Sequence, residues 1–158
     1  MFYKKITSPV GSLTLVACDK VLKSILWEND RNIQSIKSMI ECPDHTLLCE
    51  AEKQLMNYFR GALKKFNLPY HMTGTSFQKK VWETLLTIPY GQTKSYSEVA
   101  KLSGHARASR AVGSANRLNP LPILVPCHRV IGSNGSLSGF AGGHETKRFL
   151  LIHEKILS

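Results

Sequence analysis

The chain of 158 residues lacks any apolar run long enough to span a bilayer, and residues 1–6 lack the apolar segment of an export signal. These absences exclude apolar membrane-spanning helices and argue against secretion. We therefore expect no membrane partner and a location in the cytoplasm, or in the nucleus if the source is eukaryotic. Because 42% of the residues are hydrophobic, the chain can bury a core, which excludes wholesale disorder.

Cysteine is also sparse, and the four cysteines lack the closely paired spacing of a zinc knuckle. Without an export signal, we expect these thiols to be reduced. We expect neither a bound metal nor another cofactor. A zinc site formed by Cys18, Cys42, His45 and Cys49 stays open as the alternative.

Acidic residues are scarce in the second half of the chain. Residues 75–158 contain eleven Lys or Arg and only four Asp or Glu, whereas residues 1–74 contain ten and seven. A basic domain favours a polyanionic partner, most often a nucleic acid. The alternative is a basic surface that serves only solubility.

The first half of the chain predicts a small α/β unit. Strands are expected over residues 2–6, 13–17 and 21–27, a loop or weak helix over 29–41, and a helix over 46–60. None of these segments carries a catalytic pattern. We interpret the unit as a scaffold.

Helix signals dominate the second half, after a linker at residues 71–74. Thr75 with Gln78 and Ser95 with Glu98 both have capping-box spacing, which predicts two helix starts. The second helix is expected to end near Leu102, with that side chain facing inward. A last helix is expected from about Glu145, with an apolar side formed by Phe149, Leu150, Leu151 and Ile152.

Between these helices, residues 107–117 predict a helix with two different faces. Small and apolar residues fall on one arc, at Ala108, Ala111, Val112 and Ala115. Polar and basic residues fall on the other arc, at Arg107, Arg110, Ser114 and Arg117. A short helix, a glycine-containing turn and a basic helix are typical of a helix-turn-helix. Two packed helices with a solvated basic face are the alternative.

The segment 121–130 places a cysteine at a rigid corner. Pro126 fixes its own backbone and favours an extended residue before it, and Cys127 follows, with His128 and Arg129 directly behind. A thiol reacts as its thiolate, which neighbouring cations favour. The segment therefore indicates a reactive nucleophile, and a buried, inert cysteine is the alternative.

The residues around this cysteine resemble a known family, the O6-alkylguanine-DNA alkyltransferases. The similarity covers the second half nearly continuously and the first half weakly, at residues 54–61 and 66–69. The matching motifs are 77–86, Ile88-Pro89-Tyr90-Gly91, Ser95-Tyr96, Arg110-Ala111-Val112-Gly113, Asn119-Pro120, Pro126-Cys127-His128-Arg129-Val130 and Gly142-Gly143.

The resemblance implies an α/β plus α fold with two domains. Residues 1–72 would form a ribonuclease H-like α/β domain. Residues 73–158 would form a helical domain with a winged helix-turn-helix that binds DNA and accepts the alkyl group. The protein would act as a monomer on double-stranded DNA that contains alkylated guanine.

The resemblance also implies the chemistry. The protein would be a methylated-DNA–protein-cysteine methyltransferase that moves the alkyl group of O6-alkylguanine to Cys127 once per molecule, with O4-alkylthymine as a further candidate substrate. Arg110 would fill the place of the flipped base, and Tyr96 would crowd its phosphate and donate a proton. Asn119, His128 and Glu154 would prepare the thiolate, with His128 taking the proton through water.

The remaining expected site residues fall into two sets. Further DNA contacts are expected at Ser95, Arg107, Ser114, Arg117 and Arg129, and a substrate pocket at Val130, Phe140, Ala141 and Gly142. Family members often have Tyr and Ser where Phe140 and Ala141 stand, which bears on substrate preference. Asn116 replaces a larger apolar residue of some members.

Two other functions stay open. A protein that binds alkylated DNA without transfer would need no reactive Cys127. A Cys-His hydrolase would need an oxyanion hole and many turnovers, and the basic helix would have no role in it.

Overall fold

The computed structural model describes all 158 residues and divides into two compact units, Met1–Thr73 and Gly74–Ser158. The domain boundary expected between residues 72 and 73 lies one residue before this division. No helix in either unit has both the length and the apolar character needed to cross a membrane.

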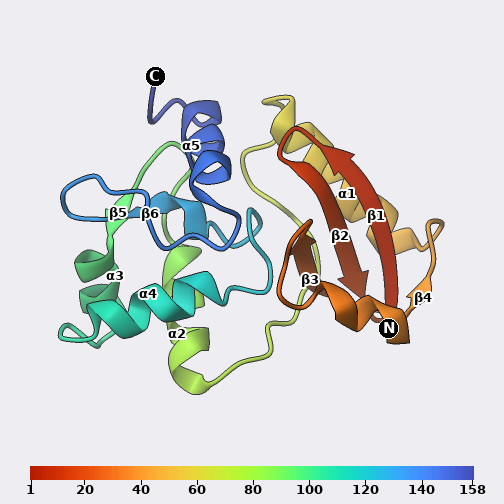
Figure 1. Ribbon diagram of the computed structural model, residues 1–158, viewed down its shortest axis with the longest axis horizontal. Coiled ribbons are helices and arrows are strands. Elements are labelled where there is room, and N and C mark those ends of the chain that lie inside the picture. Colours follow the sequence, from red (N-terminus) through yellow and green to blue (C-terminus); the bar gives the residue numbers. More distant parts are fainter. The chain divides into compact units, whose positions relative to one another are not determined.

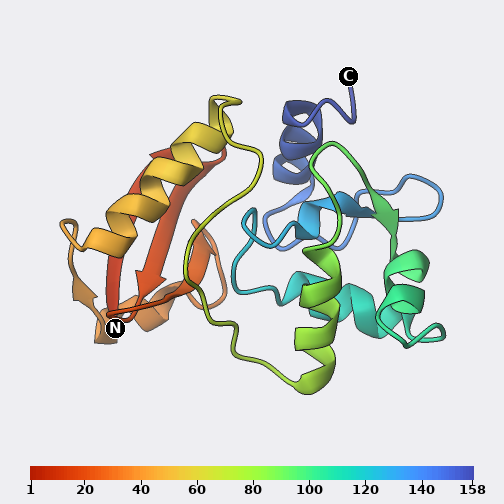
Figure 2. The ribbon, with the colours of Figure 1, turned by 180° about the vertical axis from the view of Figure 1, so that it is seen from behind.

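The first unit is a sheet covered by one long helix (Figure 1). Its elements are β1 (Phe2–Ser8), β2 (Gly11–Ala17), β3 (Leu22–Trp27), the 3-10 helix η1 (Ile33–Ser38), β4 (Ile40–Glu41) and α1 (Thr46–Phe59). The strands lie in the order β3-β2-β1-β4, with β4 parallel to β1 and the other pairs antiparallel. Figure 2 shows α1 lying across one face of this sheet, where it contacts β1 and β2.

Periodic patterns predicted this unit well, except at its edge. The three longer strands and α1 lie where the sequence predicts them. Residues 29–41, predicted as a loop or weak helix, contain η1 and the edge strand β4. Ile40 pairs with Phe2 although its side chain is 61% exposed, so no buried alternation marked this strand.

The second unit is mostly helical. Its elements are α2 (Ser76–Leu85), β5 (Lys94–Ser95), α3 (Tyr96–Leu102), α4 (Ser109–Arg117), the 3-10 turn η2 (Cys127–Arg129), β6 (Val130–Ile131) and α5 (His144–His153). Both predicted capping boxes are present, Thr75 with Gln78 at α2 and Ser95 with Glu98 at α3. The indole nitrogen of Trp82 on α2 donates a buried hydrogen bond of 2.8 Å to the carbonyl of Ala115 on α4.

Helices α3 and α4 form the expected helix-turn-helix, with three local corrections. Helix α4 begins at Ser109, so Arg107 lies in the turn before it. Ala111 is exposed, and Asn116 takes a place on the buried face. Leu102, expected to face inward, is 58% exposed because α3 ends there and the chain turns away at Gly104.

Helix α5 buries a narrower apolar face than its sequence predicts. Leu150 and Leu151 are buried, but Phe149 and Ile152, expected on the same side, are 38% and 40% exposed. The fully buried side chain that shares this face is Lys147. The helix ends at His153 with Glu154 as its C-cap, because Lys155 adopts the left-handed backbone, with φ of 63°.

Candidate active site

Cys127 begins η2 at the end of a tightly turned segment. The amide of Val125 donates to the carbonyl of Leu121 over 2.8 Å, and Ile123 within this turn has φ of 73°. The side chain of Asn119 spans the same turn, donating to the carbonyl of Val125 (2.8 Å) and accepting from the amide of Leu121 (3.0 Å). A β-branched residue in the left-handed region is strained, so the surrounding bonds must hold this turn in place.

His128 and Glu154 form a buried pair beside Cys127. Their Nε2 and Oε2 atoms are 2.6 Å apart, and neither side chain is exposed. Burial lowers the pKa of His128, although Glu154 opposes the shift. A neutral imidazole must therefore carry its proton on Nε2 to donate to the carboxylate. Nδ1, which has no hydrogen-bond partner in the protein, is left as a free acceptor.

Cys127 is a thiol at rest. Its side chain is nearly inaccessible, and burial raises its pKa from 9.0 to about 11. The amide of Asn119 and the charge of Lys147 both act in the opposite direction, because each stabilises the thiolate. Burial in the site therefore favours the neutral thiol of Cys127, while Asn119 and Lys147 favour its thiolate.

Lys147 is the site residue that the sequence did not predict. Its ammonium lies 3.5 Å from the hydroxyl of Tyr96 and over the rings of Tyr96 and Phe140, at 5.7 and 5.8 Å from their centroids. Burial lowers its pKa from 10.5 to about 8, while Cys127 opposes the shift. Helical spacing from Leu150 and Leu151 was the signal that could have located this lysine on the inner face of α5.

Tyr96 connects α3 to the loop before α5. Its hydroxyl donates a hydrogen bond of 3.0 Å to the carbonyl of Ser138. The pKa of Tyr96 is raised, first by burial and then by the neighbouring Cys127. Gly139 has φ of 82°, and a Cβ added there would lie 3.2 Å from the Tyr96 hydroxyl. The close approach of this loop therefore depends on glycine.

The expected DNA-contact residues do not all lie on the same helix. Arg110, Ser114 and Arg117 lie on the outer side of α4, and Arg107 is exposed in the preceding turn. Ser95 caps α3, where its hydroxyl accepts the Glu98 amide over 3.1 Å. The opposite side of α4 is buried and carries Val112, Ala115 and Asn116.

Arg129, which the sequence places among the DNA contacts, is turned inward in the structure. Its side chain is 8% exposed and its guanidinium is held inside the protein. Two nitrogens donate to the carboxylate of Glu154, over 2.8 and 3.1 Å, and the third donates to the carbonyl of Ile88 over 2.7 Å. Such a buried ion pair is not available to DNA.

The expected substrate-pocket residues lie in different environments. Val130 is fully buried and pairs with Lys94 of the short parallel sheet β5-β6. Phe140 is 9% exposed, and its ring lies under the ammonium of Lys147. Ala141 is exposed and Gly142 is partly exposed on the loop that leads into α5. Phe140 is therefore the pocket residue with a direct contact to the charged groups around Cys127.

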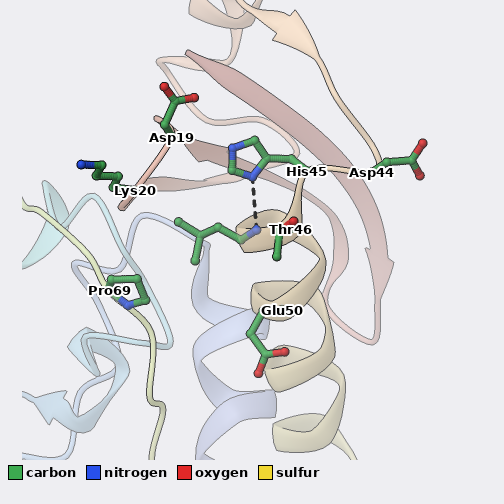
Figure 3. A pocket seen from close by; sticks show the side chains of 8 residues that line it. Asp19, Lys20, Asp44, His45, Thr46, Glu50 and Pro69 are labelled. Atoms are coloured by element: carbon green, nitrogen blue, oxygen red, sulfur yellow. Dashed lines mark hydrogen bonds between the residues drawn. The ribbon is translucent and has the colours of Figure 1, made fainter.

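The first unit contains no comparable cluster. No group of three His, Cys, Asp or Glu side chains is arranged to hold a metal ion. Figure 3 shows His45 with its ring turned toward the start of α1, where Nδ1 accepts the amide of Leu47 over 3.2 Å, while Asp44 points away. Cys49 contacts the ammonium of Lys4 and the carbonyl of Pro43 instead of another cysteine.

Both units match models of one protein family. The model of the ribonuclease-like domain of 6-O-methylguanine DNA methyltransferase matches residues 1–72, and the model of its DNA-binding domain matches residues 76–156. The methylated-DNA–protein-cysteine methyltransferase of Methanosarcina acetivorans is 46% identical over 156 residues, which cover 96% of each chain. The constitutive enzyme of that name from Bacillus subtilis is 43% identical over 162 residues, covering 98% of this chain and 96% of the relative.

A solved structure agrees with these sequence matches. The crystal structure of Mycobacterium tuberculosis OGT in complex with DNA has a TM-score of 0.92 and 44% identity, covering 98% of this chain and 93% of that one. The expected fold class, a ribonuclease-like α/β unit followed by a helical DNA-binding unit, is thereby confirmed. The chain belongs to the 6-O-methylguanine DNA methyltransferase family.

Proposed function

We propose that this protein repairs DNA by moving the alkyl group of O6-alkylguanine to the sulfur of Cys127. The observation that carries the proposal is the buried pair of His128 and Glu154, which leaves Nδ1 of His128, the residue that follows Cys127, as a free proton acceptor. The names of the relatives, methylated-DNA–protein-cysteine methyltransferases, support the same reaction. The protein acts as a monomer, and each molecule acts once because nothing in the site removes a thioether.

The reaction needs a thiolate, and the neighbours of Cys127 supply one. The thiol proton passes to Nδ1 of His128, through a water molecule because Nδ1 has no direct protein partner. Glu154 stabilises the resulting imidazolium. The thiolate then attacks the alkyl carbon, a C–S bond forms, and the C–O bond breaks. Its electrons remain on the guanine, which takes up a proton from the hydroxyl of Tyr96.

The outer face of α4 is the proposed DNA contact. Arg110, Ser114 and Arg117 lie on it, within a unit that carries most of the excess positive charge. The solved structure of a similar protein in complex with DNA supports duplex DNA as the partner. A base inside a duplex is out of reach of a buried sulfur, so the alkylated guanine must rotate out of the stack, with Arg110 taking its place.

Adduct mapping tests the proposal. The protein is incubated with a duplex that contains one O6-methylguanine, and its peptides are analysed by mass spectrometry. We expect one methyl group on Cys127 and none after Cys127→Ser substitution. A wild-type protein that binds the duplex and stays unmodified would show a lesion-binding protein without transfer, and continued turnover of an ester would show a hydrolase.

A further inference from the structure

Arg129 lies at the centre of the buried polar network, although it directly follows His128 in the sequence. Its Nε and Nη2 donate to the two carboxylate oxygens of Glu154, over 2.8 and 3.1 Å, and its Nη1 donates to the carbonyl of Ile88 over 2.7 Å. Glu154 also accepts the amide of Gly91 over 3.2 Å. Arg129 thus fixes the carboxylate relative to the imidazole from a second side.

The charge of Arg129 matters because the carboxylate faces a titratable ring. A buried carboxylate 2.6 Å from His128 favours the imidazolium, in which both ring nitrogens carry protons. That form cannot take the proton of Cys127. The positive charge of Arg129 offsets part of this attraction, because its guanidinium is bound to the same carboxylate.

The charged and titratable groups around His128 act on its pKa in both directions. Burial lowers the pKa of His128; Glu154 raises it, whereas Arg129 and Lys147 lower it. Cys127 is uncharged at rest, and Tyr90, which lies near Glu154 and Arg129, has a raised pKa and is also uncharged. Glu154 is therefore the only negative charge beside the ring, and Arg129 is its direct counter-ion.

We propose that Arg129 is a positioning residue that keeps His128 neutral, with its proton on Nε2, so that Nδ1 can accept the proton of Cys127. This inference rests on the proposed alkyl transfer. It replaces the expected DNA contact with a role in the proton path. The role requires the positive charge of the side chain more than its forked shape.

Single-turnover transfer rates measured against pH test this role, with saturating O6-methylguanine duplex and two variants. In Arg129→Met, the acid limb of the profile should move upward by about one pH unit, because His128 stays protonated to higher pH. At pH values below the wild-type limb, the rate should therefore fall about tenfold. Arg129→Lys keeps the charge and should restore most of the wild-type profile. An unshifted Arg129→Met profile, or equal shifts in both variants, would overturn the proposal.

Two further measurements distinguish the positioning role from a phosphate contact and from a purely structural one. The affinity of Arg129→Met for the duplex and its salt dependence should equal those of the wild type, whereas loss of a phosphate contact would weaken both. If Arg129→Met does not fold, nitrogen NMR of histidine-labelled wild-type protein gives the answer. We expect His128 to be neutral at pH 7 with its proton on Nε2, and an imidazolium there would refute the role.

The behaviour of the wild type separates failure of the positioning role from failure of the proposed function. If wild-type protein never acquires a methyl group, the proposed function itself fails. If the wild type is methylated and the Arg129 variants follow its pH profile, only the role of Arg129 fails.

Discussion

Asn116, on the buried side of α4, donates a hydrogen bond of 3.2 Å from its side-chain amide to the carbonyl of Cys127. Burial raises the pKa of Tyr96, and the side chain of Asn116 opposes this rise, while the oxygen Oδ1 of Asn116 has no hydrogen-bond partner. Helix α4 carries arginines on its outer face, and through Asn116 on its inner face it contacts both Cys127 and Tyr96.

Substitutions of Asn116 should separate the effect of the hydrogen bond from that of side-chain volume. Asn116→Leu removes the bond and also the unsatisfied oxygen, so we expect the free energy of unfolding to change by about 1 kcal/mol or less. Asn116→Asp places a carboxylate against the Cys127 carbonyl in a buried site and should cost several kcal/mol. Urea unfolding measures both. An Asp variant as stable as the Leu variant would contradict the donor role.

The parts of the fold that the sequence predicted are those controlled by neighbouring residues. The capping boxes at Thr75 and Ser95 involve residues three positions apart, and both are confirmed. The long helix α1 follows from a periodic apolar face. Such local signals need no knowledge of the tertiary structure.

The site residues that were missed or misplaced depend on distant parts of the chain. Arg129 turns inward because Glu154, 25 residues later, and Ile88, 41 residues earlier, accept its hydrogen bonds. Lys147 is buried with its ammonium against the hydroxyl of Tyr96, 51 residues earlier. Ile123 adopts a positive φ that no local preference of a β-branched residue favours. A basic residue in such a sequence is therefore assigned to DNA by default, and only the fold can correct it.

Lys147→Met should lower activity and raise stability at pH 7. The lysine lowers the pKa of Cys127, so its loss should slow methyl transfer about tenfold or more. Lowering the pKa of Lys147 from 10.5 to about 8 by burial corresponds to about 3 kcal/mol against folding at pH 7, of which the variant should recover a part.

The stability gained in Lys147→Met should depend on pH, because burial lowers the pKa of Lys147. Below pH 8, Lys147 is charged in both the folded and the unfolded protein, so the full free-energy cost of burying its charge is present. Between about pH 8 and 10.5 the folded protein binds fewer protons than the unfolded chain, so the contribution of Lys147 to stability improves with pH. The difference in unfolding free energy between Lys147→Met and wild type should therefore shrink over this range. A constant difference would show that Lys147 is not buried as a cation.

Gly139→Ala should disturb the loop over the active site. The left-handed backbone at φ 82° disfavours any side chain, and the new methyl group would lie 3.2 Å from the hydroxyl of Tyr96. We expect a loss of about 1–2 kcal/mol in stability and a weaker bond between Tyr96 and the Ser138 carbonyl. Gly135→Ala is the matched control, since Gly135 has φ of 84° and no atom close to the added Cβ. Equal effects of the two variants on the transfer rate would exclude a role for the contact with Tyr96.

Arg110→Ala should reduce repair without changing the fold. Arg110 is exposed on α4, so the unfolding free energy should stay within about 0.5 kcal/mol of the wild type. If its side chain occupies the place of the flipped guanine, its loss should lower the rate of methyl transfer from a duplex much more than the rate with free O6-methylguanine, which needs no flipping. Arg31→Ala, an exposed arginine of the first unit, removes the same charge and should leave both rates unchanged. Equal losses of rate with duplex and free base in Arg110→Ala would assign the arginine to the chemical step, because the free base has no stack to fill.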